Sequence, residues 1–134
     1  MSERKNNEKL LASEAEIGTS YNGVLAGLTF TASVLIFTFR TSLPFSEIFL
    51  SLALITTILF IYACTLSADA SGALSDGRID DAKRKLDLSD YFGVMGFLSM
   101  FSEITFIAFC TGWLCGALIS IVEIVGFAIF MKYS

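Results

Sequence analysis

The sequence predicts an all-α integral membrane protein with four transmembrane helices. Hydrophobic residues make up 54% of the 134 residues and the mean hydropathy is +0.71, more than a water-soluble chain of this size usually carries. Charged residues are 16% of the chain and gather near the N-terminus, in the stretch 67–90 and at the last positions. Four apolar stretches remain, each about 19 to 23 residues long, which is enough to cross a hydrocarbon core of about 30 Å. The predicted spans are 21–39, 44–66, 91–111 and 113–131.

The N-terminal segment 1–20 is polar and precedes a single transmembrane domain, 21–134. Its few apolar residues give a short amphipathic pattern, which fits either a helix at the membrane surface or a solvated cytoplasmic tail. Thr19 or Ser20 is expected to cap the first span, and Arg40 closes it.

Small residues recur every four positions along the first span, at Gly23, Gly27 and Thr31. Small side chains let two helix backbones approach closely in lipid, where the hydrophobic effect does not drive helix association. We expect this stripe to be a helix-packing face, and a pore-lining face is the alternative.

The second span begins at the only proline, Pro44, which suits a first helical turn. Glu47 falls in the same turn, where interfacial water and the helix dipole favour a negative charge, so we treat it as structural. The polar loop 67–90 follows. It is expected to hold a short amphipathic helix on the cytoplasmic surface, because Ala82 and Leu86 share one helical face.

The third span is expected to be capped by Ser89. Lysines and arginines then fix the orientation, since cytoplasmic loops carry an excess of them. On one side of the predicted membrane lie Arg4, Lys5, Lys9, Arg78, Lys83, Arg84, Lys85 and Lys132. Only Arg40 lies on the other side. We therefore predict a protein of the cytoplasmic (plasma) membrane with both termini and the loop 67–90 in the cytoplasm.

Glu103 and Glu123 are the acidic residues that lie deep inside the predicted spans. A charge at the bilayer centre costs about 3 kcal/mol on insertion scales, so such a residue is a functional-site hypothesis by default. Each acid lies ten positions from Trp113, at the turn between the third and fourth spans. At about 1.5 Å per residue, both fall about 15 Å below that turn, near the bilayer midplane and on adjacent antiparallel helices.

Each acid shares a predicted helix face with small and hydroxyl residues. These are Gly96, Ser99 and Cys110 around Glu103, and Gly116, Ser120 and Gly126 around Glu123. The glycines are expected to serve helix packing, and the two serines to serve the acids. Because two carboxyls close together in low dielectric cannot both ionise, one or both should hold a proton. Three interpretations stay open: a hydrogen-bonded lock that fixes the helix register, a site for protons or cations, and a pair completed by a basic residue of a partner helix.

The cysteines and the missing histidine limit the chemistry. Cys110 and Cys115 flank the outer turn, as either a disulfide or two packed thiols. No cysteine pair has C-x-x-C spacing, and the chain contains no histidine. The common zinc sites, His-ligated haem and Ser-His-Asp catalysis are therefore excluded, and we predict no enzyme, no metal site and no cofactor.

Two functional hypotheses remain for a protein whose surroundings are the lipid bilayer. The net charge of −4 and the pI near 4.6 argue against nucleic acid as a partner. The first hypothesis is a small channel or transporter for protons or monovalent cations. It should act as a homo-oligomer, because a single four-helix bundle fills its interior with side chains. The alternative is a non-catalytic structural or accessory subunit of a larger membrane complex.

Overall fold

The protein is all-helical in its described part. The structure, a computed structural model, describes residues 2–39, 45–113, 116–118 and 120–125. It contains three long helices, α1 (Ser2–Thr38), α2 (Ser46–Ser75) and α3 (Ile79–Thr111). Each of them is long and apolar enough to cross a membrane, and no strand occurs among these residues. The predicted all-α class is confirmed, with three helices able to span a membrane.

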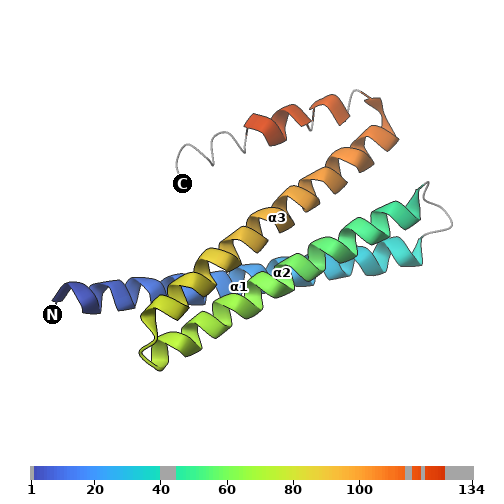
Figure 1. The fold of residues 1–134 in the computed structure, drawn as a ribbon. Helices are drawn as coiled ribbons and strands as arrows, with labels where there is room; N and C mark the ends of the chain where they lie inside the picture. The colour runs from blue at the N-terminus through green and yellow to red at the C-terminus, as the bar shows by residue number, and fades with distance from the viewer. Residues whose placement is uncertain (1, 40–44, 114–115, 119, 126–134) are drawn as a thin grey trace.

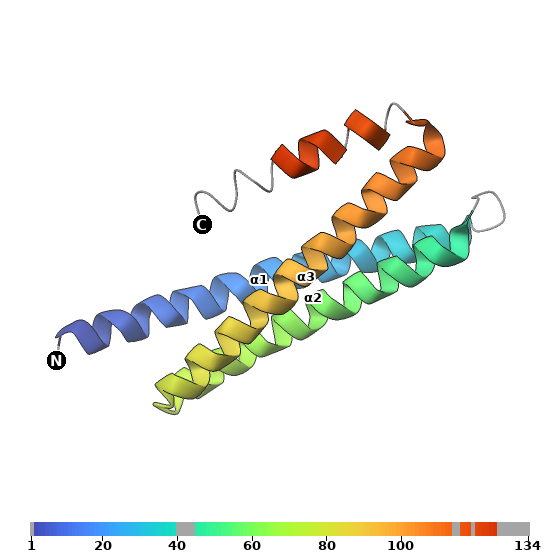
Figure 2. The same ribbon diagram turned by 45° about the horizontal axis from the view of Figure 1, so that its top comes forward.

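The predicted fourth span, 113–131, is described only in its first part. Residues 116–118 and 120–125 are helical and return alongside α3, on the side away from α1 and α2 (Figures 1 and 2). The remainder of that span lies outside the described residues, as do Arg40 and Pro44.

All three helices are longer than one membrane crossing requires. α3 has 33 residues, which at 1.5 Å per residue is about 50 Å, against a hydrocarbon core of about 30 Å. α1 runs without a break from Ser2, so the segment 1–20 is the first half of this helix. Thr19, expected as an N-cap, therefore lies inside α1, where its hydroxyl donates to the Ala15 carbonyl at 2.8 Å.

The expected separate surface helix within 67–90 is wrong. α2 and α3 run through this stretch and are joined only by residues 76–78, so it forms the closed end of a helical hairpin (Figure 1). Gly77 ends α2 in the left-handed conformation, with φ of 76°. Arg78 N–H donates to the Ala73 carbonyl at 2.9 Å, which completes a Schellman cap. The charges that indicated a loop lie instead on two helices that continue beyond their apolar stretches.

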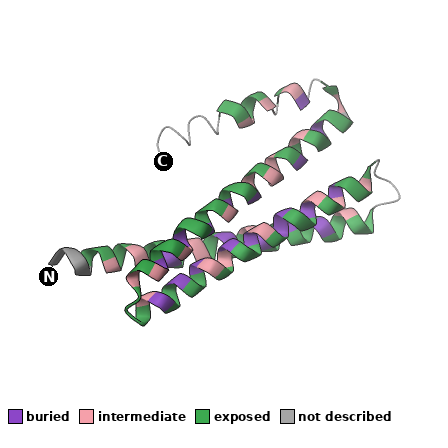
Figure 3. Cartoon of the chain, in the orientation of Figure 1, coloured by how far each residue is buried: buried purple, intermediate pink, exposed green. Residues whose placement is uncertain are grey.

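α2 is the central helix. It packs along both α1 and α3, which meet each other much less. Its buried positions recur every three or four residues, among them Thr56, Phe60, Ala63 and Ser67. Buried residues follow the inner helix faces, whereas the outer faces are largely exposed (Figure 3) and carry many large apolar side chains. Such a surface suits contact with lipid tails, which are as apolar as the side chains.

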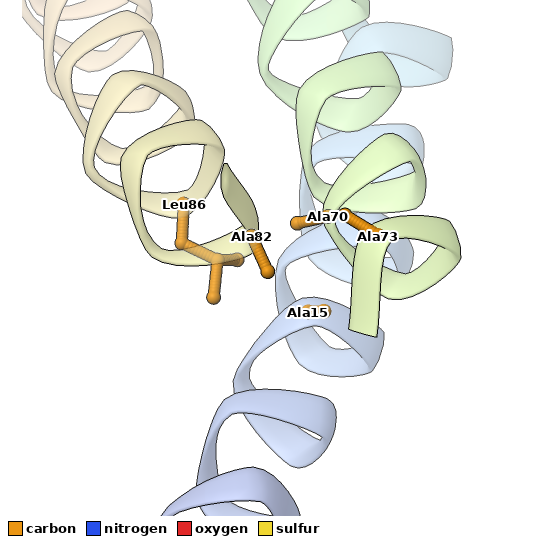
Figure 4. Packing of buried hydrophobic residues seen from close by; sticks show 5 residues of the cluster. All are labelled: Ala15, Ala70, Ala73, Ala82 and Leu86. Carbon is orange, nitrogen blue, oxygen red and sulfur yellow. The ribbon is translucent and has the colours of Figure 1, made fainter. Parts of the chain in front are cut away.

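At the hairpin end, the three helices pack through small side chains (Figure 4). The cluster consists of Ala15 from α1, Ala70 and Ala73 from α2, and Ala82 and Leu86 from α3. It lies beside the charged residues of the hairpin, and removing its apolar surface from water is favourable. The helix ends thus form a short three-helix bundle that continues the apolar region and fixes the register of α3 on α2.

Candidate functional site

Glu103 is buried in the interface between α3 and α2, with 8% of its surface exposed. The hydroxyl of Thr56, on α2, lies 2.8 Å from its Oε1. The same hydroxyl oxygen lies 2.6 Å from the Oγ of Ser99. Ser99 precedes Glu103 by one turn of α3, so both side chains reach one hydroxyl of the facing helix.

The neighbouring residue of α2 extends this polar layer to α1. The Oγ1 of Thr57 lies 3.0 Å from that of Thr29, and both threonines are buried. Two adjacent hydroxyls therefore join α2 to its neighbours, Thr56 to α3 and Thr57 to α1. Neither was predicted as a site residue, although a Thr-Thr pair in the middle of an apolar stretch was a visible signal.

Glu103 has only neutral partners. No Lys or Arg occurs in the apolar stretches 21–39, 46–66 and 91–111. The described ion pairs lie at the hairpin end, where Arg78 lies 2.9 Å from both Asp76 and Asp81. No described basic residue therefore balances a charge on Glu103.

A second buried hydroxyl pair lies closer to the hairpin end. The Oγ atoms of Ser67 on α2 and Ser89 on α3 are 2.7 Å apart, and the Ser89 hydroxyl is 2.8 Å from the Ala63 carbonyl. Ser89 is thus an internal contact of α3 and not the expected cap. α1 approaches closely here, since a Cβ on Gly18 would lie 2.6 Å from the Ser67 Oγ.

Glu123 has a different partner. Its Oε2 accepts a hydrogen bond from the Thr105 hydroxyl of α3, while its Oε1 is buried and has no hydrogen-bond partner among the described residues. Thr105 and Glu103 are two positions apart, about 200° around the helix, so they lie on opposite sides of α3. No hydrogen bond joins the two carboxyls, both of which belong to described residues. The structure therefore gives each acid its own threonine.

The other predicted residues around the acids take up packing positions. The Ser120 hydroxyl donates to the Gly116 carbonyl at 2.8 Å. A Cβ on Gly96 would lie 2.9 Å from the ring of Phe60, and one on Gly116 would lie 2.5 Å from the ring of Phe109. Gly126 lies outside the described residues.

The Gly23, Gly27 and Thr31 stripe lies mostly outside the contacts of α1 with the described helices, although a Cβ on Gly23 would lie 3.5 Å from the Cys64 Sγ of α2. All three residues are exposed, and a Cβ on Gly27 would meet nothing within 4 Å. The residues of α1 that are buried in this region are Asn22, Ala26, Thr29 and Ser33. The buried stripe and the glycine stripe lie on adjacent faces of α1, since Asn22 and Ala26 each precede one of the two glycines by one position.

The cysteines are only partly described. Cys110 is exposed, while Cys115, expected beside it as a disulfide partner or a packed thiol, lies outside the described residues. Cys64, which had no predicted role, donates from its Sγ to the Thr19 carbonyl at 3.3 Å and so joins α2 to α1. Among the described residues, no group of Cys, Asp and Glu is arranged to hold a metal ion.

Two shallow grooves lie between α1 and α2 at the hairpin end, with volumes of about 510 Å³ and about 430 Å³. They share Ala12 and Ser71, and neither is lined by Glu103 or Glu123. Neither groove therefore gives these acids a path to solvent.

Comparison of the chain with protein-family models, with curated proteins and with solved structures finds no match.

Proposed function

We propose that the protein is a small channel or transporter for protons or monovalent cations, with Glu103 as its principal site. The observation that carries the proposal is the surroundings of Glu103. A carboxyl group is held inside an apolar helix bundle by the hydroxyl of Thr56, which also contacts the hydroxyl of Ser99, and no described basic side chain lies beside it. Such an acid is costly in a membrane, and residues of this kind mark ion and proton pathways.

Glu123 forms the second part of the proposed site, and Ser120 lies one turn before it in the sequence. The Oε1 of Glu123 is a buried acceptor with no partner in the part of the chain that the structure describes, and such groups usually bind a proton, an ion or another donor. Glu103 lies on one side of α3, and Thr105, the partner of Glu123, lies on the opposite side. We therefore propose that the two acids are successive positions on the transport path, separated by α3. This replaces the single shared pair expected from their equal depth.

The proposed assembly is a homo-oligomer with both termini and the hairpin end in the cytoplasm. The proposed fourth span, 113–131, completes each subunit. Oligomerisation is proposed because side chains such as Phe60 fill the interface of α2 with α3, which leaves little room for water inside one subunit. An ion path between subunits does not require a water-filled space inside any one subunit.

Flux into liposomes tests the proposal. Purified wild-type protein should pass protons or monovalent cations down an imposed gradient. Glu103→Gln should reduce this flux to the level of protein-free liposomes, and Glu123→Gln should reduce it in part. Glu47→Gln is the matched control, because Glu47 is exposed in the first turn of α2. Wild-type flux that both site variants leave unchanged would remove the proposal.

A second candidate is a structural or accessory subunit of a larger membrane complex. It is favoured by the exposed face of α1 that carries Gly23, Gly27 and Thr31, where a facing helix would meet no bulky side chain at Gly27. Purification from native membranes separates the two candidates. A stoichiometric larger partner supports the subunit function, and a closed homo-oligomer supports transport.

A further inference from the structure

The hydroxyl of Thr56 has three oxygen neighbours at hydrogen-bonding distance. The Leu52 carbonyl oxygen lies 2.9 Å away, the Ser99 Oγ 2.6 Å away and the Glu103 Oε1 2.8 Å away. A threonine hydroxyl carries one proton and two lone pairs, so it donates one hydrogen bond and accepts two. These three contacts therefore use its full capacity.

The positions of the protons follow from this limit. The Leu52 carbonyl has no proton of its own and can only accept. All three contacts are hydrogen bonds at once only when Thr56 donates to Leu52 and accepts from both Ser99 and Glu103. Glu103 can donate only when it is protonated, so the complete network requires a proton on its carboxyl group.

The ionised carboxylate has another arrangement. Thr56 must then donate its single proton to Oε1, while Ser99 still donates to Thr56. The contact between Thr56 and Leu52 then has no proton in it. This costs little, because a buried i−4 carbonyl of a helix already accepts a backbone N–H. Both charge states are therefore accommodated by a rotation about one C–O bond.

We propose that Glu103 is a proton-binding site and that Thr56 is its positioning residue, whose hydroxyl turns from Oε1 to the Leu52 carbonyl when Glu103 takes up a proton. This rests on the proposed transport function and narrows the carried species to the proton.

The distances in the network are those of hydrogen bonds between hydroxyl and carboxyl groups. The oxygens of Ser99 and Glu103 lie 2.6 Å and 2.8 Å from that of Thr56. These separations are typical of O–H···O hydrogen bonds.

No other titratable group of the described helices forms a hydrogen bond or ion pair with Glu103. Glu123 bonds to Thr105 and Cys64 to the Thr19 carbonyl. The remaining titratable residues of the described helices near or within the apolar stretches are Tyr21, Glu47, Tyr62, Asp90, Tyr91 and Cys110. None of these groups shares a hydrogen bond or ion pair with Glu103 in the part of the chain that the structure describes.

Infrared spectroscopy of the full chain in phosphatidylcholine liposomes, recorded across a pH titration, tests the proposal. A carboxylic-acid C=O band should appear as the pH falls and should be absent from Glu103→Gln. Thr56→Val should move this band to higher wavenumber, because the acid loses its hydrogen-bond acceptor. Thr56→Ser should keep the wild-type position. Thr57→Val is the matched control, since Thr57 is also buried and its hydroxyl bonds to Thr29 and Ala53.

Two results would overturn the inference: no band that depends on Glu103, or the same band position in the Thr56→Val and Thr57→Val variants. If Thr56→Val does not fold, Thr56→Cys replaces it, because a thiol is a weaker acceptor and should give a smaller shift of the same sign. The band reports proton binding without transport. If Thr56→Val shifts the band but the protein passes no ions, this inference is supported and the transport proposal is removed. If the flux depends on Glu103 but Thr56→Val does not shift the band, the transport proposal is supported and this inference is overturned.

Discussion

Replacing Gly96 by alanine tests the packing that brings Glu103 to Thr56. Gly96 lies two turns before Glu103 on α3, and the ring opposite it belongs to Phe60, one turn after Thr56 on α2. A Cβ on Gly96 would lie 2.9, 3.0 and 3.1 Å from three ring atoms of Phe60, whereas carbon atoms normally pack at about 3.5–4.0 Å. The Phe60 side chain is fully buried, so neighbouring atoms oppose a movement of the ring away from the new methyl group.

The expected magnitude follows from two opposing effects. Overpacking a filled interface costs about 1–3 kcal/mol, while glycine to alanine inside a helix gains up to about 1 kcal/mol. Gly27→Ala is the matched control, because a Cβ there meets nothing within 4 Å and only the helical gain applies. Gly96→Ala should therefore be less stable than Gly27→Ala by about 1–3 kcal/mol.

Equilibrium unfolding in mixed micelles, followed by the helical circular dichroism signal, measures this difference. Shortening the ring should relieve the clash, so the double variant Gly96→Ala/Phe60→Leu should lose less stability than the sum of its single variants. Equal stability of the Gly96→Ala and Gly27→Ala proteins would refute the packing of α3 on α2 and, with it, the position of Glu103.

Three further predictions concern the hairpin end. Gly77→Ala should destabilise the protein by about 1–2 kcal/mol, since the left-handed φ at this position is costly for a residue with a Cβ; no loss in chemical unfolding would contradict the cap. Leu86→Ala should cost about 2–5 kcal/mol in the same assay, because Leu86 is 3% exposed within the alanine cluster; a loss below about 1 kcal/mol would mean that the cluster is not packed there. Arg78→Ala should change stability by at most about 1 kcal/mol, since its ion pairs are exposed, and raising the salt concentration should abolish the difference; a larger, salt-independent loss would contradict this.

Hydropathy was enough to predict the helical class and three helices able to span a membrane, because long runs without charge have few alternatives. It was not enough to locate the helix ends. Charges in 67–90 indicated a loop, but a helix can continue into water when one face stays buried. Here Ala73, Ala82 and Leu86 supply that face, and the pattern of Ala82 with Leu86 was already visible in the sequence.

The inner faces of the helices were harder to predict. In the first span, Gly23 and Gly27 alternate with Asn22 and Ala26 at the same spacing, and lipid accepts either face. The structure buries the second pair. Periodicity alone cannot choose between adjacent stripes when the solvent is itself apolar.

The partner of Glu103 was also beyond the sequence. Hydroxyl residues in a helix can bond to their own i−4 carbonyl, as Thr56 does with Leu52, so they need no partner from another helix. Counting residues from Trp113 predicted how deep Glu103 and Glu123 lie in the membrane. It did not predict their partners, because these depend on the direction in which each side chain points around the helix axis. Thr56 on one side and Thr105 on the other separate them.

Proton flux through liposomes containing either the wild-type protein or Glu103→Gln, at equal incorporation, tests the central claim most directly. An imposed pH gradient should collapse faster with the wild-type protein than in protein-free liposomes, and Glu103→Gln should return the rate to that of the protein-free control. Equal rates for the two proteins would contradict the account, as would a wild-type rate no faster than that of lipid alone.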